Sequence, residues 1–200
     1  MGKYSHEPKL LLGTMPMVFR YNQARTAGIS RRALTYLIDS GDLELIERGL
    51  YRKTNAPLAD LGLLALAIRA PSATLCLGTA LSRHGLSDEI PVSLDIALPR
   101  GIREPKVEAP ITWHHFHTAT FYIGRNEIDL DGELKLGLYS PERSIVDAFR
   151  TRAIEGNELA ITALKRWLRQ KGSQPSQLLS LAANWPRTVP VIRRTLEVLL

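Results

Sequence analysis

The sequence contains a single cysteine, and its longest apolar stretch is interrupted by charged residues. Cys76 is the only cysteine among 200 residues, which excludes an internal disulfide and indicates a reducing compartment such as the cytoplasm. It lies in the apolar run Ala73–Leu77, which predicts a buried structural thiol. The longest apolar stretch, Leu58–Ala70, is too short to cross a bilayer and contains Asp60 and Arg69. We therefore expect a soluble, cytoplasmic protein.

The sequence also lacks a group of residues typical of a catalytic or metal site. His114, His115 and His117 are close in sequence, but on a strand His115 and His117 point to one side and His114 to the other. At most two of them could share a metal, and no cysteine or carboxylate follows at ligand spacing. Neither Cys76 nor His84 has the base-and-orienter arrangement that nucleophilic catalysis needs. We expect no enzymatic activity, no cofactor and no metal.

One short pattern leaves a catalytic alternative open. Glu133-Leu134-Lys135 is a Glu-x-Lys sequence, as found in metal-dependent nucleases, where the pair needs an aspartate from a neighbouring strand. Asp129 or Asp95 could supply that aspartate. The intervening Asp131-Gly132 is first of all a hairpin-turn sequence. The alternative function is therefore a metal-dependent nuclease using Asp129, Glu133 and Lys135.

Charge is unevenly distributed along the chain. Apolar residues make up 44% and charged residues 23%, an ordinary globular composition, with a net charge of +6 and a pI near 9.7. Residues 1–55 carry nine Lys/Arg and five Asp/Glu, whereas residues 56–200 carry seventeen and fifteen. The basic excess of the first segment favours nucleic acid as a partner.

Residues 22–53 have the pattern of a winged helix. Asn22 is expected to cap a short helix closed by Gly28, and Ser30 to cap a second helix that Gly41 ends. Two strands around Arg48-Gly49 are then expected as a hairpin, residues 43–46 and 50–53. A first helix at residues 5–16 and a strand at residues 18–21, pairing with the wing, complete the unit. We predict a winged helix-turn-helix domain over residues 1–55.

The second predicted helix, residues 31–40, has one apolar and one polar face. At 100° per residue, Leu34 and Leu37 fall on the side that faces the core. Two arginines in the first turn oppose the positive end of the helix dipole, which favours an anionic partner outside the chain. The predicted DNA-binding residues are those on the polar face, the flanking helix and the wing: Arg25, Ser30, Arg31, Arg32, Thr35, Tyr36, Arg48, Arg52 and Lys53.

Residues 56–200 are expected to form a second, mixed α/β domain with a helical tail, so the fold class is α+β. The boundary is placed in the turn-rich tetrapeptide Thr54–Pro57. Helices are expected at residues 58–69, 79–84, 140–152, 157–170, 175–184 and 189–200. Strands are expected at residues 73–77, 93–99, 111–117, 121–124, 127–130 and 134–139. Arg143 and Asp147 lie one helical turn apart, which predicts an ion pair.

Four segments of this sequence resemble the AbiEi family, the antitoxins of type IV toxin–antitoxin systems. They are, in chain order, QARTAGISRRALTYLIDSGDLELIERGLYR, TALSRHGLSDEIP, DIALPRGIREP and LYSPERSIVDAFR. The resemblance covers most of residues 20–170 and weakens beyond residue 172. It implies a transcriptional autorepressor of a two-gene operon, whose functional partner is a nucleotidyltransferase-like toxin that it opposes without a stable complex. By resemblance, Arg31, Arg32, Thr35 and Tyr36 occupy recognition-helix positions and Arg48 the wing.

The sequence is compatible with two further functional interpretations. A protein-interaction module that has lost DNA binding would keep the same winged-helix pattern. A second basic surface, made by Lys165, Arg166 and Arg169, complements the C-terminal end of its helix and could also contact a phosphate or an RNA. The loop Pro99–Arg103 could make the same kind of contact with a phosphate or an RNA. The sequence favours a DNA-binding regulator over both.

Overall fold

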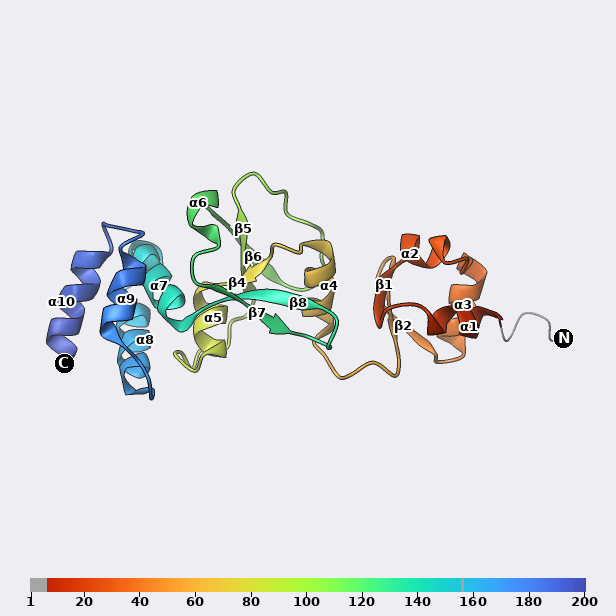
Figure 1. Ribbon diagram of the computed structural model, residues 1–200, viewed down its shortest axis with the longest axis horizontal. Coiled ribbons are helices and arrows are strands. Elements are labelled where there is room, and N and C mark those ends of the chain that lie inside the picture. Colours follow the sequence, from red (N-terminus) through yellow and green to blue (C-terminus); the bar gives the residue numbers. More distant parts are fainter. Residues whose placement is uncertain (1–6, 156) are drawn as a thin grey trace. The chain divides into compact units, whose positions relative to one another are not determined.

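The computed structural model describes residues 7–155 and 157–200, and it has an α+β fold (Figure 1). The described chain divides into two compact units. Unit 1 comprises the residues up to Pro71 together with Lys106–Glu108 and Asp129–Lys135. Unit 2 comprises Ser72–Pro105, Ala109–Ile128 and Leu136–Leu200. None of the helices in the described part of the chain combines the length and hydropathy that a membrane span requires.

Unit 1 contains a helix-turn-helix and a wing. Its elements are α1 (Glu7–Gly13), β1 (Val18–Arg20), α2 (Tyr21–Thr26), α3 (Arg31–Asp39), β2 (Leu43–Glu47), β3 (Leu50–Lys53) and α4 (Leu61–Arg69). The strands form an antiparallel sheet in the order β1-β3-β2 (Figure 1). The predicted helix-turn-helix, the hairpin and the pairing of β1 with the wing are confirmed. Phe19, Ile29, Leu34 and Leu37 are buried in the core between the helices and the sheet.

Of the two predicted N-caps of α2 and α3, one is confirmed and one is wrong. Ser30 caps α3, because its hydroxyl accepts the Ala33 N–H at 3.2 Å. Asn22 does not cap α2, which begins one residue earlier, at Tyr21. The Arg20 N–H instead donates to the Gln23 side-chain oxygen at 2.7 Å, so the chain turns into the helix before it reaches Asn22.

Unit 1 extends beyond the turn at Thr54–Pro57, where the sequence predicts the boundary between residues 1–55 and 56–200. Helix α4 belongs to this unit, because the Arg69 side chain pairs with Glu47 and donates to the Arg48 carbonyl at 3.1 Å. A small second core joins α4 to the sheet and to the two later segments: Val18, Leu50, Leu64 and Ala65 with Val107, Leu130 and Leu134. The compact unit therefore includes α4 and residues 106–108 and 129–135.

Unit 2 is a five-stranded sheet followed by helices. Its elements are β4 (Thr74–Leu75), α5 (Leu77–Arg83), β5 (Leu94–Pro99), β6 (Ile111–Phe116), α6 (Thr118–Phe121), β7 (Arg125–Asp129), β8 (Lys135–Tyr139), α7 (Pro141–Glu155), α8 (Asn157–Arg169), α9 (Pro175–Ala182) and α10 (Val189–Leu199). The strand order is β6-β5-β4-β8-β7 (Figure 1). β4 pairs antiparallel with β5 and parallel with β8, and β5 pairs parallel with β6.

Two predicted strands of unit 2 differ from the structure. The strand expected at residues 121–124 is wrong: α6 occupies residues 118–121, started by the His117 Nδ1 atom, which accepts the Ala119 N–H at 3.2 Å. The strand expected at residues 73–77 is shorter, because Leu77 adopts φ +42° and begins α5. Cys76, just before it, is fully buried as predicted.

The predicted Arg143–Asp147 pair is confirmed and lies in the interior of unit 2. The Arg143 Nε atom donates to Asp147 at 2.8 Å, and both side chains are completely buried. The Arg143 guanidinium also lies 4.1 Å from the Tyr139 ring centre and 4.3 Å from the Trp185 ring centre. Burial raises the pKa of the Asp147 carboxyl, and Arg143 and Arg150 oppose that shift. This cluster holds the start of α7 in place.

Candidate nucleic-acid interface

Helix α3 presents the polar face that its sequence predicts. Leu34 and Leu37 are buried, whereas the opposite side is exposed along its length: Arg31, Arg32, Thr35, Tyr36 and Asp39. Tyr36 leaves 40% of its surface in solvent, which is high for a large aromatic residue. The face is therefore available to a partner over the whole helix.

The first turn of α3 gathers positive charge without an acidic residue to balance it. Arg31 and Arg32 follow the Ser30 cap, and the first turn contains no Asp or Glu. The unpaired N–H groups of a helix start add a partial positive charge at the same place. The Arg31 guanidinium lies 5.5 Å from the centre of the Tyr21 ring, so an aromatic face holds it. The positive charge at this end of α3 therefore favours an anion as its partner.

The wing is a short hairpin whose tip is anchored to the start of α2. Arg48 and Gly49 form the turn between β2 and β3, and Gly49 adopts φ +78°, a left-handed conformation that favours glycine. The Gly49 carbonyl accepts the Tyr21 N–H at 2.9 Å. Tyr21 thus contacts the wing tip through its backbone and Arg31 through its ring. The sequence-based prediction did not include Tyr21, although this aromatic residue at the start of the helix-turn-helix was visible in the sequence.

Four exposed arginines on the helix-turn-helix and the wing of unit 1 lack a carboxylate partner. They are Arg25 on α2, Arg31 and Arg32 on α3, and Arg48 at the wing tip. A fifth exposed arginine, Arg20, precedes α2 and donates to the Ile68 carbonyl. Each of the other arginines of α4, β3 and unit 2 that forms an ion pair does so with a carboxylate of its own unit, for example Arg166 with Asp88. Among the side chains of residues 8–152 and 157–200, no such ion pair involves any of the four. Exposed and unneutralised guanidinium groups are what phosphate and base contacts need.

Arg52 is not placed where a phosphate contact would need it. Only 7% of Arg52 is exposed, and its guanidinium pairs with Glu44 and donates to the carbonyls of Ala56 and Pro57. The strand register explains this burial, because Glu44 lies directly opposite Arg52 on the neighbouring strand. The expectation that Arg52 lies exposed on the returning strand of the wing, with a phosphate as its nearest target, is corrected accordingly.

Lys53 is buried as well, with 8% of its surface exposed. Its ammonium donates to the Met15 carbonyl, which follows α1. The Lys53 side chain therefore lines a cavity inside unit 1 and does not lie on the exposed face of the wing. The expectation that Lys53 is exposed on the wing is corrected on the same ground, and a contact with DNA stays a prediction.

The residues considered for metal chemistry have separate partners. His114 Nε2 lies 2.9 Å from Asp95, His115 Nε2 lies 3.2 Å from the Ile102 carbonyl, and His117 caps α6. No group of three His, Cys, Asp or Glu side chains comes together as a metal site in the part of the chain that the structure describes.

The acidic residues that a nuclease site would use accept hydrogen bonds from backbone N–H groups. Asp129 accepts the Gly132 N–H at 2.6 Å, and Glu133 accepts the Met17 N–H at 3.0 Å. Asp131 accepts the N–H groups of Glu133 and Leu134 at 3.0 and 2.7 Å. These bonds shape the connection between β7 and β8, as the Asp-Gly turn predicts.

A unit with a helix-turn-helix formed by α2 and α3, a hairpin wing and exposed arginines on α3 is a winged helix-turn-helix of the DNA-binding class. Residues 17–52 match the family described as "Transcriptional regulator, AbiEi antitoxin". The matched segment runs from the residue before β1 to the third residue of β3, so it contains α2, α3 and the wing tip. No curated protein matches the chain. The match supports a role as a DNA-binding transcriptional regulator.

Proposed function

We propose that this protein is a cytoplasmic transcriptional autorepressor and the antitoxin of a type IV toxin–antitoxin pair. In this proposal α3 enters the major groove of operator DNA and the wing lies against the adjacent minor groove. The observation that carries it is the set of four exposed, unneutralised arginines within or beside the helix-turn-helix, inside the segment that matches an antitoxin regulator family.

The proposed contacts divide into two kinds. Arg32, Thr35 and Tyr36 lie on the exposed face of α3 and are assigned to base edges. Arg31 and the Ser30 end of the helix are assigned to a phosphate, since the helix dipole and the guanidinium act there together. Arg25 and Arg48 flank that face and are assigned to the DNA backbone and the minor groove.

Binding to the DNA upstream of the gene tests this assignment. The full-length protein should bind a fluorescent duplex of that region more tightly than a shuffled duplex, in an anisotropy titration at two salt concentrations. The logarithm of the binding constant should fall linearly with the logarithm of the salt concentration, with a slope of about −0.9 per phosphate contact. A protein that binds neither duplex would be the interaction module considered above, and the proposal would fail.

The functional partner in this proposal is a nucleotidyltransferase-like toxin, opposed without a stable complex. Co-expression of the antitoxin should restore the growth of cells that express the toxin of the same operon. The two proteins should not co-elute in gel filtration. A stable complex would contradict the type IV assignment while leaving the DNA-binding proposal untouched.

We further propose that the protein has no nuclease activity. Incubation of a supercoiled plasmid with the protein and Mg²⁺ or Mn²⁺ should leave the plasmid intact. Nicking that disappears in Glu133→Gln would overturn this statement.

A further inference from the structure

Three cationic side chains are buried in the described part of the chain, and one of them lacks a carboxylate. Arg52 pairs with Glu44, and Arg143 pairs with Asp147. Lys53 is buried too, yet among the side chains that the structure describes, those of residues 8–152 and 157–200, no carboxylate forms an ion pair with it. Buried charges are normally paired, because an isolated charge away from water is costly. The exception therefore needs an explanation.

The hydrogen bond to Met15 satisfies one of the N–H donors of the Lys53 ammonium. A lysine ammonium has three N–H donors, and the Met15 carbonyl accepts one of them. This contact satisfies a carbonyl near the end of α1 and explains why the side chain lies there. It is a bond to a neutral group, so the charge of Lys53 remains uncompensated.

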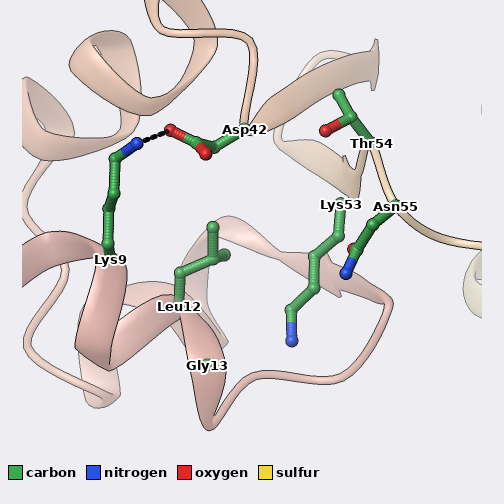
Figure 2. A pocket seen from close by; sticks show the side chains of 7 residues that line it. All are labelled: Lys9, Leu12, Gly13, Asp42, Lys53, Thr54 and Asn55. Carbon is green, nitrogen blue, oxygen red and sulfur yellow. Dashed lines mark ion pairs between the residues drawn. The ribbon is translucent and has the colours of Figure 1, made fainter.

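Lys53 lines a cavity of about 270 Å³ within unit 1, between α1, the turn after α3 and the end of β3 (Figure 2). Asn55 and Lys9 line it too, and in Figure 2 the side chain of Leu12 lies between the Lys9–Asp42 pair and Lys53. This volume is just below the range of small-molecule sites, about 300–1,000 Å³. It has room for an ion or a small acid.

The other charges of the cavity cancel one another. Lys9 Nζ lies 2.8 Å from an Asp42 carboxylate oxygen, and the same oxygen accepts the Ser40 hydroxyl at 2.5 Å. The hydrogen bond from Lys9 holds the pKa of Asp42 below its usual value, and the same contact raises the pKa of Lys9. Both groups are therefore ionised near neutral pH, and their charges offset each other. The net charge of the cavity is that of Lys53.

We propose that this cavity binds a phosphate group, with the Lys53 ammonium as its counter-charge and the Asn55 amide as a second donor. The ligand is either a free phosphate or a backbone phosphate of bound DNA, which present the same oxygens to the lysine. Helix α3 is about 13 Å long, and the cavity adjoins its C-terminal end, so this site is separate from the arginines at its N-terminal end.

Inorganic phosphate and the full-length protein alone test the site, independently of DNA binding. The melting temperature of the wild type should rise with phosphate and approach saturation, since a ligand that binds only the folded state stabilises it. Lys53→Met should weaken the apparent phosphate affinity by at least about tenfold, as expected for a lost bond to a charged group. Lys106→Met removes one lysine from an exposed position of the same unit and should behave as the wild type.

Asn55→Ala keeps the test decisive if Lys53→Met does not fold. It removes an exposed side chain that lines the cavity, so folding should be preserved, and the apparent phosphate affinity should fall several-fold. A phosphate response that Lys53→Met retains in full would overturn the proposal. An unfolded Lys53→Met together with an unchanged response of Asn55→Ala would overturn it as well.

The duplex distinguishes the two sources of phosphate. If free phosphate has no effect but Asn55→Ala weakens binding to both specific and shuffled duplexes, the site holds a backbone phosphate, and the proposal stands with that source. If neither free phosphate nor duplex binding responds to the variants, the site does not exist. A protein that binds phosphate but no duplex would refute the proposed function and leave this site in place.

Discussion

Two groups of arginines in this protein have opposite environments. Arg143 in unit 2 is completely buried, pairs with Asp147 and lies against the rings of Tyr139 and Trp185. Arg31 in unit 1 is exposed, lies against the ring of Tyr21 and has no carboxylate in the described chain. The chain supplies the anion in the first case and omits it in the second. The partner of Arg143 is therefore internal, whereas a partner of Arg31 has to come from outside the chain.

Removing the buried arginine should have the largest effect. Arg143→Met leaves the buried Asp147 with Arg150 as its other ion-pair partner and removes the guanidinium donor of two carbonyls, those of Thr120 and Ile123. We expect the free energy of unfolding to fall by about 3–5 kcal/mol in urea denaturation. The matched change Arg31→Met should stay within about 0.5 kcal/mol of the wild type. Equal losses for both variants would contradict the assignment of Arg31 to a partner outside the chain.

Replacing Arg32 and Arg52 separates an external contact from an internal one. Arg32→Ala should cost about 1–3 kcal/mol on the upstream duplex and much less on a shuffled duplex, because a base edge is its proposed target. Arg52→Ala should lower the free energy of unfolding by about 1–3 kcal/mol, because its partners are left unsatisfied.

The salt dependence of duplex binding provides the control for this pair. The sequence alone predicts that Arg52 contacts a phosphate, so that its loss would reduce the salt slope by about 0.9. Since Arg52 is buried and paired, the structure leads us to expect an unchanged slope for the folded Arg52→Ala protein. A reduced salt slope for Arg52→Ala would indicate that Arg52 contacts a DNA phosphate after all.

A double-mutant cycle should sharpen the role of the aromatic ring next to Arg31. Tyr21→Leu should weaken duplex binding by about 0.5–1 kcal/mol, the strength of an exposed contact between a cation and a ring. Tyr21→Phe keeps the ring and should bind as the wild type. In the Arg31→Ala background, Tyr21→Leu should have no further effect. A full additive loss there would mean that Tyr21 acts through the fold of the wing and not through Arg31.

The smallest expected effect concerns the exposed ion pair of Lys9 and Asp42. Because Lys9 lowers the pKa of Asp42 in the folded state, this contact stabilises the fold above the pKa of the unfolded carboxyl, about 3.9. The contribution should disappear as the pH falls through the lower pKa of the folded state. Asp42→Asn should therefore lower the melting temperature slightly at pH 7 and not at pH 2. Asp39→Asn, at an exposed position without an ion pair, serves as the control.

The helix-turn-helix was predictable from sequence because its signals are local. Ser30 precedes a helix whose apolar residues repeat at helical spacing, and Leu34 and Leu37 are buried as that spacing requires. Gly28 and Gly41 both adopt the positive φ expected of glycines that end helices. The exposed face of α3 follows from the same periodicity.

The burial of the wing residues was not predicted, because it depends on partners that are distant along the chain. Two consecutive basic residues such as Arg52-Lys53 near the end of a strand suggest an exposed strand. In the structure, however, Arg52 forms an ion pair with Glu44 across the hairpin, and Lys53 donates to the Met15 carbonyl after α1. The hairpin register did contain a signal for Arg52, since pairing residue 43 with residue 53 places Glu44 opposite it. Nothing local to Lys53 indicates Met15.

The extent of unit 1 also depends on distant segments. A turn-rich tetrapeptide such as Thr54–Pro57 is a common place for a boundary, but Arg69 joins α4 to the wing through Glu47. Segments 106–108 and 129–135 join the same unit although they lie far along the chain. Sequence pattern finds individual elements and does not reveal contacts of this kind.

The two-residue tip of the wing limits how much sequence information the wing can read. Gly49 has no side chain, so Arg48 is the one side chain that the turn itself presents to a partner. The Gly49 carbonyl is bound by Tyr21 and the Arg48 carbonyl by Arg69, so the backbone of the tip has little freedom to extend. In the proposed DNA complex, a wing of this length would sense the width of a minor groove at one position. Discrimination among longer DNA sequences would then fall to the exposed face of α3.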